Sequence, residues 1–70
     1  MFFLKAVWKD GYEEKYAIPG TRFYWLQNGT WTRGSTIWDD MRANIDALGD
    51  RVKLVEWVPT PKEMEKLESF

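Results

Sequence analysis

The chain has 70 residues, which suffice for one small domain and are too few for two. It contains no cysteine and no histidine, which excludes disulfide bonds, thiolate metal sites and imidazole acid–base chemistry. Ten basic residues stand against eleven acidic ones, and a net charge of −1 gives no long-range attraction to nucleic acid or to an anionic membrane.

Aromatic rings are the main material for a core in this chain. It has five Trp, four Phe and three Tyr. Each buried ring hides roughly 150–250 Å², and a domain near this size buries only about 60% of its unfolded surface. A few rings can therefore stabilise the domain, and any further rings are available for binding.

Residues 2–18 predict a β-hairpin, because apolar and polar side chains alternate on both sides of an Asp-Gly turn. A three-residue loop with Gly11 left-handed sets Trp8 opposite Tyr12 and makes one face almost wholly apolar, with Glu14 the exception. A two-residue loop would mix rings with charges on that face. Since a one-residue slip turns every side chain over, we predict the three-residue loop.

A second hairpin follows, with strands over 21–26 and 30–33 and an Asn-Gly turn between them. Its register stays open, because Trp31 pairs with Leu26 across a two-residue loop and with Trp25 across a three-residue loop. Under either register both faces carry a large ring. This hairpin therefore cannot be apolar on one side and polar on the other.

A helix is expected after the fourth strand. Gly34 is predicted to end that strand, Ser35 or Thr36 to cap the helix, and Gly49 to stop it. Trp38 is expected at the edge of the apolar stripe, which consists of Ile37, Met41, Ile45 and Leu48.

Residues 51–58 then predict a fifth strand, and a capping box begins a short last helix. Thr60 is the expected cap, with a proline at the first helical position and Glu63 three residues after the cap. The helix is expected to run to about Ser69, with Phe70 at its end, and to be marginal unless it docks on the sheet.

These elements predict a single α+β domain over residues 1–70, in the order β-β-β-β-α-β-α. We expect a mainly antiparallel sheet of about five strands, one amphipathic helix across one face, and the short C-terminal helix. Such a sheet leaves its other face to water. Aromatic side chains on that open face would need a functional reason.

The sequence predicts no catalytic residue, no metal site and no cofactor. Asp39 and Asp40 are adjacent, but first-turn acids are what a helix start favours, and adjacent helical residues point about 100° apart. Each of the five glycines has a turn or cap role, so no phosphate-binding loop is indicated. We therefore expect a protein that is not an enzyme.

A protein partner is the favoured function, because interface centres are rich in Trp, Tyr and Arg. The second hairpin and the helix start have that composition, and Trp25 and Trp31 are the expected anchors. In size, absent cysteine and aromatic content the chain resembles small proteins from phages and mobile elements that block host enzymes, although no motif carries the resemblance. The predicted partner-binding residues of this inhibitor or adaptor are Arg22, Tyr24, Trp25, Trp31, Arg33 and Trp38.

Two alternatives remain open. Rings interleaved with basic residues on a sheet are also the stacking platform of single-stranded nucleic-acid binders. An exposed apolar sheet face can equally be covered by a second copy of the chain, which would make a homodimer. No signal peptide and no apolar run long enough for a bilayer is present, so a cytoplasmic protein without a membrane partner is expected.

Overall fold

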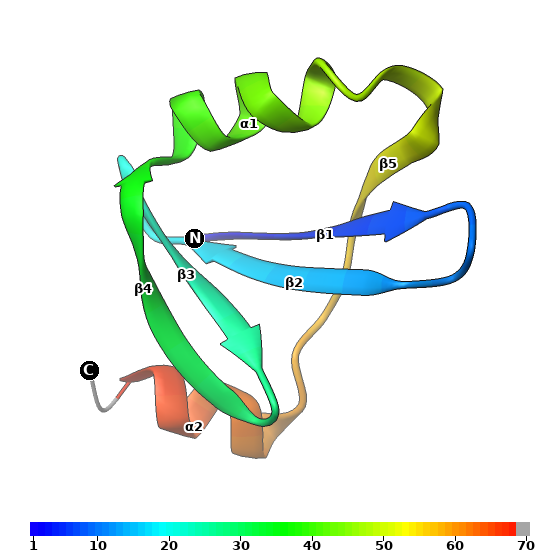
Figure 1. The fold of residues 1–70 in the computed structure, drawn as a ribbon. Coiled ribbons are helices and arrows are strands. Elements are labelled where there is room, and N and C mark those ends of the chain that lie inside the picture. Colours follow the sequence, from blue (N-terminus) through cyan, green and yellow to red (C-terminus); the bar gives the residue numbers. More distant parts are fainter. Residues whose placement is uncertain (69–70) are drawn as a thin grey trace.

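The computed structural model describes residues 1–68 and contains one five-stranded sheet in the order β4-β3-β2-β1-β5, with every neighbouring pair antiparallel (Figure 1). The predicted α+β class and element order are confirmed. The elements are β1 (Phe2–Trp8), β2 (Glu13–Ile18), β3 (Arg22–Gln27), β4 (Thr30–Ile37), α1 (Trp38–Asp46), a 3-10 turn (Gly49–Arg51), β5 (Val52–Glu56) and α2 (Pro61–Glu68).

The first hairpin has the predicted register. Leu4 lies opposite Tyr16, and the Trp8 amide donates to the Tyr12 carbonyl across a three-residue loop, at 2.9 Å. Gly11 has a φ of +92°, the left-handed conformation that this loop needs. The predicted register, which gathers the apolar side chains on one face of the hairpin, is therefore confirmed.

The second hairpin closes with a two-residue loop, which settles the open register. Leu26 pairs with Trp31, and Trp25 pairs with Thr32. Asn28 and Gly29 both have positive φ, 53° and 75°. A type I′ turn requires this of both central residues, and its twist matches that of the flanking strands.

The prediction that Gly34 ends the fourth strand is wrong. β4 continues to Ile37 through an irregularity in its pairing with β3, between the Tyr24–Arg33 and Arg22–Ile37 pairs. A Cβ on Gly34 would overlap the ring of Phe23, so the absence of a side chain there lets this ring lie directly on the strand. Gly34 is thus a packing residue.

Because the strand runs longer, α1 begins at Trp38, and Ile37 is its cap without a side-chain hydrogen bond. The predicted stripe is consequently wrong at its first member. Ile37 is 38% exposed, whereas Trp38 is 8% exposed and packs into the core. The buried side of the helix follows i, i+3 and i+7 from Trp38, through Met41 and Ile45.

The sheet has a hydrophobic cluster on each face. The cluster under α1, here the α1 cluster, contains three rings in mutual contact, those of Tyr16, Phe23 and Trp38, with centroids 5.4–5.8 Å apart. Its other buried members are Ala6, Ile18, Ile45 and Val52. Figure 1 shows α1 lying across this face of the sheet and α2 lying below the turn of the β3–β4 hairpin.

The cluster on the opposite face, here the α2 cluster, is built from Ala17, Trp31 and Leu67. The predicted capping box begins α2: the Thr60 amide donates to Glu63 Oε1 at 2.8 Å, and the Glu63 amide donates to Thr60 Oγ1 at 3.2 Å. The helix is docked, so the expectation of a second face left wholly to water is corrected. The prediction for Ser69 and Phe70 lies outside the described residues.

Candidate partner-binding surface

The predicted binding residues do not share one surface, because β3 alternates between the two faces. Trp25 pairs with Tyr16 and belongs to the α1 side, whereas Tyr24 pairs with Ala17 and belongs to the α2 side. Arg33 pairs with Tyr24. The structure therefore brings Tyr24 and Arg33 together and places Tyr24 on the face opposite Trp25, while Arg33 still contributes to the wall of a hollow that Trp25 lines.

Two of the predicted binding residues are core residues. Trp31 is 4% exposed, stacks on Trp57 at 6.3 Å, and donates its indole N–H to the Glu63 carbonyl at 2.8 Å. Trp38 is buried against Tyr16 and Phe23. Trp31 and Trp38 therefore offer little surface to a partner while the fold is intact, and the expectation that their rings are exposed is not met.

The remaining four predicted residues are accessible to different degrees. Arg22 and Arg33 are exposed, and Tyr24 and Trp25 are half-buried. Tyr24 packs on the α2 cluster, and Trp25 packs on the edge of the α1 cluster. Among these four, Trp25 is the large ring that lines a hollow in the surface.

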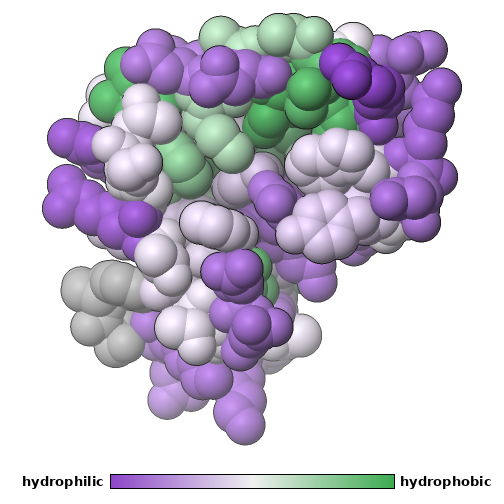
Figure 2. All heavy atoms as spheres, viewed as in Figure 1, coloured by the Kyte–Doolittle hydropathy of each residue, from purple (hydrophilic) through white to green (hydrophobic). Residues whose placement is uncertain are grey.

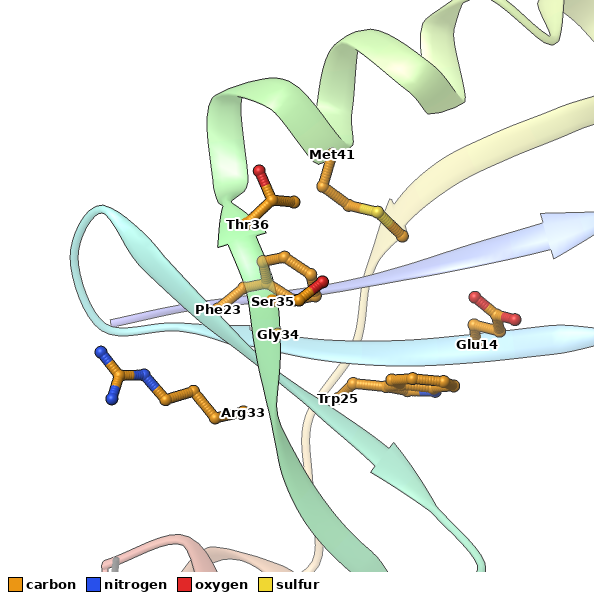
Figure 3. A pocket seen from close by; sticks show the side chains of 8 residues that line it. All are labelled: Glu14, Phe23, Trp25, Arg33, Gly34, Ser35, Thr36 and Met41. Carbon is orange, nitrogen blue, oxygen red and sulfur yellow. The ribbon is translucent and has the colours of Figure 1, made fainter.

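That hollow, here the bulge pocket, lies where β4 departs from regular pairing with β3 (Figure 3). Bulges re-aim side chains and often occur beside functional sites. In Figure 3 the indole of Trp25 extends from β3 toward Glu14 on β2, and Met41 reaches down from α1. The pocket has a volume of about 290 Å³ and is lined by Glu14, Phe23, Trp25, Arg33, Gly34, Ser35, Thr36 and Met41.

The carboxylate in this pocket is held by two phenols. The Tyr16 hydroxyl donates to Glu14 Oε2 at 2.6 Å, and the Tyr12 hydroxyl donates to Glu14 Oε1 at 3.2 Å. Burial, with this hydrogen bond and the nearby negative charge, raises the pKa of Tyr16 well above its ordinary 10.0. The charge of Glu14 raises the pKa of Tyr12 as well, so both phenols stay neutral donors near pH 7.

The aromatic surface continues from the pocket toward the first hairpin's turn. Tyr12 is 55% exposed, and its ring packs on half-buried Trp8 with centroids 5.4 Å apart. Trp8, Tyr12 and Glu14 of this surface were not among the binding residues predicted from the sequence. The available signal was Glu14 itself, the one charge on an otherwise apolar strand face.

A second accessible apolar region lies at the other end of β1. Phe2 lines two hollows, one shared with Trp38 and one with Trp57, and is itself 71% exposed. Met1 and Val58, beside it, are 64% and 89% exposed.

In Figure 2 the hydrophobic side chains of the visible face gather around α1, and less polar, pale side chains fill the area beneath it.

Within residues 1–68, no cluster of three or more acidic side chains could hold a metal ion, and no helix is long and apolar enough to cross a bilayer. Comparisons of the chain with protein-family models, with curated proteins and with solved structures found no match in any of the three.

Proposed function

We propose that the protein is a small non-enzymatic binding module that docks on a protein partner through the bulge pocket and the adjoining Trp8–Tyr12 surface. The observation that carries the proposal is the half-buried indole of Trp25 on the wall of a surface pocket. Trp and Tyr are the residues that most often dominate binding energy at protein interfaces.

Rigidity supports this assignment. Trp25 packs against the α1 cluster, and Glu14 is fixed by two tyrosine hydroxyls. A surface whose side chains are already ordered loses little conformational entropy when a partner binds. This is the property that a stoichiometric inhibitor or an adaptor requires, and the cysteine-free composition favours work in the cytoplasm.

The proposal can be tested by photo-crosslinking in extracts of the native host. Thr32 pairs with Trp25 and is exposed, so a photoreactive side chain at position 32 lies beside the proposed surface. We expect a protein to be crosslinked there, and the product to persist after nuclease treatment. The same group at Lys62, which is exposed on α2, is the position control.

The variants decide whether the captured protein is a true partner. With the identified protein purified, Trp25→Ala should weaken binding by about 2–4 kcal/mol, the range of interface hot spots. Phe2→Ala, which removes an exposed ring at the other end of β1, should leave binding unchanged. Equal crosslinking from position 62, or binding that Trp25→Ala does not weaken, would contradict the proposal. A crosslink between two copies would instead identify a homodimer.

Single-stranded nucleic acid is a second candidate, on the opposite face. Lys5 and Lys15 pair across β1 and β2, and Lys53, opposite Val7, extends the same face on β5. Lys15 also lies 5.3 Å from the ring centroid of Trp57. Glu13 partly offsets this charge, through an ion pair with Lys5 at 3.3 Å.

This second candidate predicts a salt-dependent complex. A fluorescent oligodeoxythymidine should bind at about 50 mM salt and lose most of its affinity by about 200 mM, because phosphate contacts release counterions. Lys15→Gln combined with Lys53→Gln should weaken that binding, and Trp25→Ala should not. Absence of binding at about 50 mM salt would reject the nucleic-acid candidate and leave the protein-binding proposal untouched.

A further inference from the structure

We infer that the bulge pocket receives a cationic side chain of the partner, the ammonium of a lysine or the guanidinium of an arginine. The carboxylate of Glu14 would be its counter-ion, and the indole of Trp25 the ring face against which it lies. This inference rests on the proposed function, and it specifies the chemistry that the partner must bring.

Glu14 is prepared to accept a further hydrogen bond. Each of its oxygens accepts one tyrosine hydroxyl, from Tyr12 and from Tyr16. An ionised carboxylate has about four lone-pair sites, so both oxygens keep acceptor capacity after these bonds are made. The two phenols fix the carboxylate without neutralising its charge, and that charge lies among apolar and aromatic side chains, where its attraction for a cation is less screened than in water.

Trp25 supplies the second half of the recognition. Its indole extends toward Glu14 in Figure 3, and Met41 comes down from α1 on the same side. Among aromatic side chains, the indole face attracts cations most strongly. A carboxylate beside an indole is a pairing that favours a cation with an apolar stem, since the stem can lie along the ring and the methionine while the charge reaches Glu14.

The charges around the pocket favour a cation over an anion. Thr36 lines the pocket and donates to Asp40 Oδ2 at 3.4 Å, which places a second carboxylate near the rim. Arg33 also lines the pocket, but its guanidinium points away from both Trp25 and Glu14 in Figure 3. A phosphate or a carboxylate group in the pocket would be repelled by the negative charge of Glu14.

The size of the pocket argues for one side chain. Its volume, about 290 Å³, is at the lower limit of pockets that enclose a whole small-molecule ligand, roughly 300–1,000 Å³. The exposed Tyr12 beside it offers further contact area to the partner's surface around that side chain. A side chain presented by a protein fits these features better than a free metabolite does.

The inference is tested without the partner, by NMR titration of the ¹⁵N-labelled full chain. The probes are N-acetyl-lysine amide and N-acetyl-arginine amide, with the uncharged N-acetyl-norleucine amide and the anionic N-acetyl-glutamate amide as controls. We expect the cationic probes alone to shift the Trp25 indole N–H and the amides of residues 34–36. The indole N–H of Trp57, on the opposite face, should not move.

Two variants identify the groups responsible. Glu14→Gln has nearly the same shape but no charge: its amide oxygen can accept one tyrosine hydroxyl, and its NH2 can donate to the other phenol oxygen. It should weaken cation binding about tenfold, equivalent to about 1.4 kcal/mol. Trp25→Leu keeps an apolar side chain without a ring and should also weaken binding. Glu56→Gln, at an exposed acid outside the bulge pocket, should have no effect.

The inference is overturned if norleucine or glutamate amide produces the same shifts, if the cationic probes produce none, or if Glu14→Gln binds cations as the wild type does. These outcomes are separable from failure of the proposed function. A partner crosslinked at position 32 whose binding needs Trp25 but not the charge of Glu14 would support the docking surface and reject the cation. Binding of the cationic probes without any partner crosslinked at position 32 would support the cation site and reject the docking surface.

Discussion

Trp25 and Trp31 lie on the same hairpin, on opposite faces of the sheet, and their surroundings differ completely. Trp31 is sealed under α2 and gives its indole N–H to that helix. Trp25 is only partly covered and lines a pocket beside Glu14. A hairpin with rings on both faces needs two covers. In this chain α2 covers Trp31 almost completely, whereas Trp25 stays half-buried, which makes one indole structural and leaves the other available.

Removing the sealed indole should have the largest effect on the fold. Trp31→Ala deletes a buried ring and leaves a cavity under α2, at a cost of about 3–5 kcal/mol in the free energy of unfolding. Trp25→Ala, at a half-exposed ring, should cost only about 1–2 kcal/mol. Urea unfolding followed by circular dichroism measures both, and equal losses would contradict the distinction between the two indoles.

The pocket's shape depends on Gly34. Gly34→Ala places a methyl group in the space of the Phe23 ring and should destabilise the fold by about 1–3 kcal/mol. Gly20→Ala is the matched control, because nothing lies within 4 Å of the added carbon and the change should be close to neutral. The loss should also shrink in a Phe23→Leu background. Strict additivity of the two substitutions would show that the ring is not the obstacle.

High pH should weaken the α1 side selectively, through Tyr16. Its pKa in the fold is raised above the ordinary 10.0 by burial and by Glu14. The stabilisation from the neutral phenol is fully present below pH 10 and is lost as pH rises beyond it, because the unfolded chain ionises first. The slope from this group approaches about 1.4 kcal/mol per pH unit. Urea midpoints between about pH 9 and pH 11 should fall less steeply for Tyr16→Phe, and identical slopes would refute this cause.

The smallest effect should come from the cap of α2. Thr60→Ala removes one half of the capping box and should cost about 1 kcal/mol, with faster amide exchange in the first turn of α2. Glu63→Gln is the control, because glutamine serves equally in this motif. Exchange that is unchanged in Thr60→Ala would show that packing of Trp31 and Leu67, and not the cap, holds the helix in place.

The two hairpins also show how far a sequence can predict this fold. The first could be placed in register because one of its faces is apolar and its loop glycine is left-handed. The second could not, because Trp25 and Trp31 give both faces a ring. The Asn-Gly pair was the deciding signal, since the type I′ turn it favours closes a two-residue loop.

The helix boundary was wrong for a tertiary reason. A glycine after a strand ordinarily predicts a stop, but Gly34 is required by the Phe23 ring that lies on it, and the strand continues. Because α1 begins at Trp38, the indole of Trp38 points into the core. The burial of Trp31 likewise depends on where α2 docks, and local sequence patterns do not encode docking. Trp31 and Trp38 are thus both buried through contacts that are distant in sequence.

The central claim, that Trp25 is open and Trp31 is sealed, is tested most directly by ¹⁹F NMR of the protein labelled with fluorotryptophan. A soluble paramagnetic reagent broadens the signals of accessible rings. The resonance of Trp25, assigned from the Trp25→Leu variant, should broaden strongly, while those of Trp31 and Trp38 should stay sharp. Equal broadening of Trp25 and Trp31 would contradict the structure's division of the two faces and the binding function proposed from it.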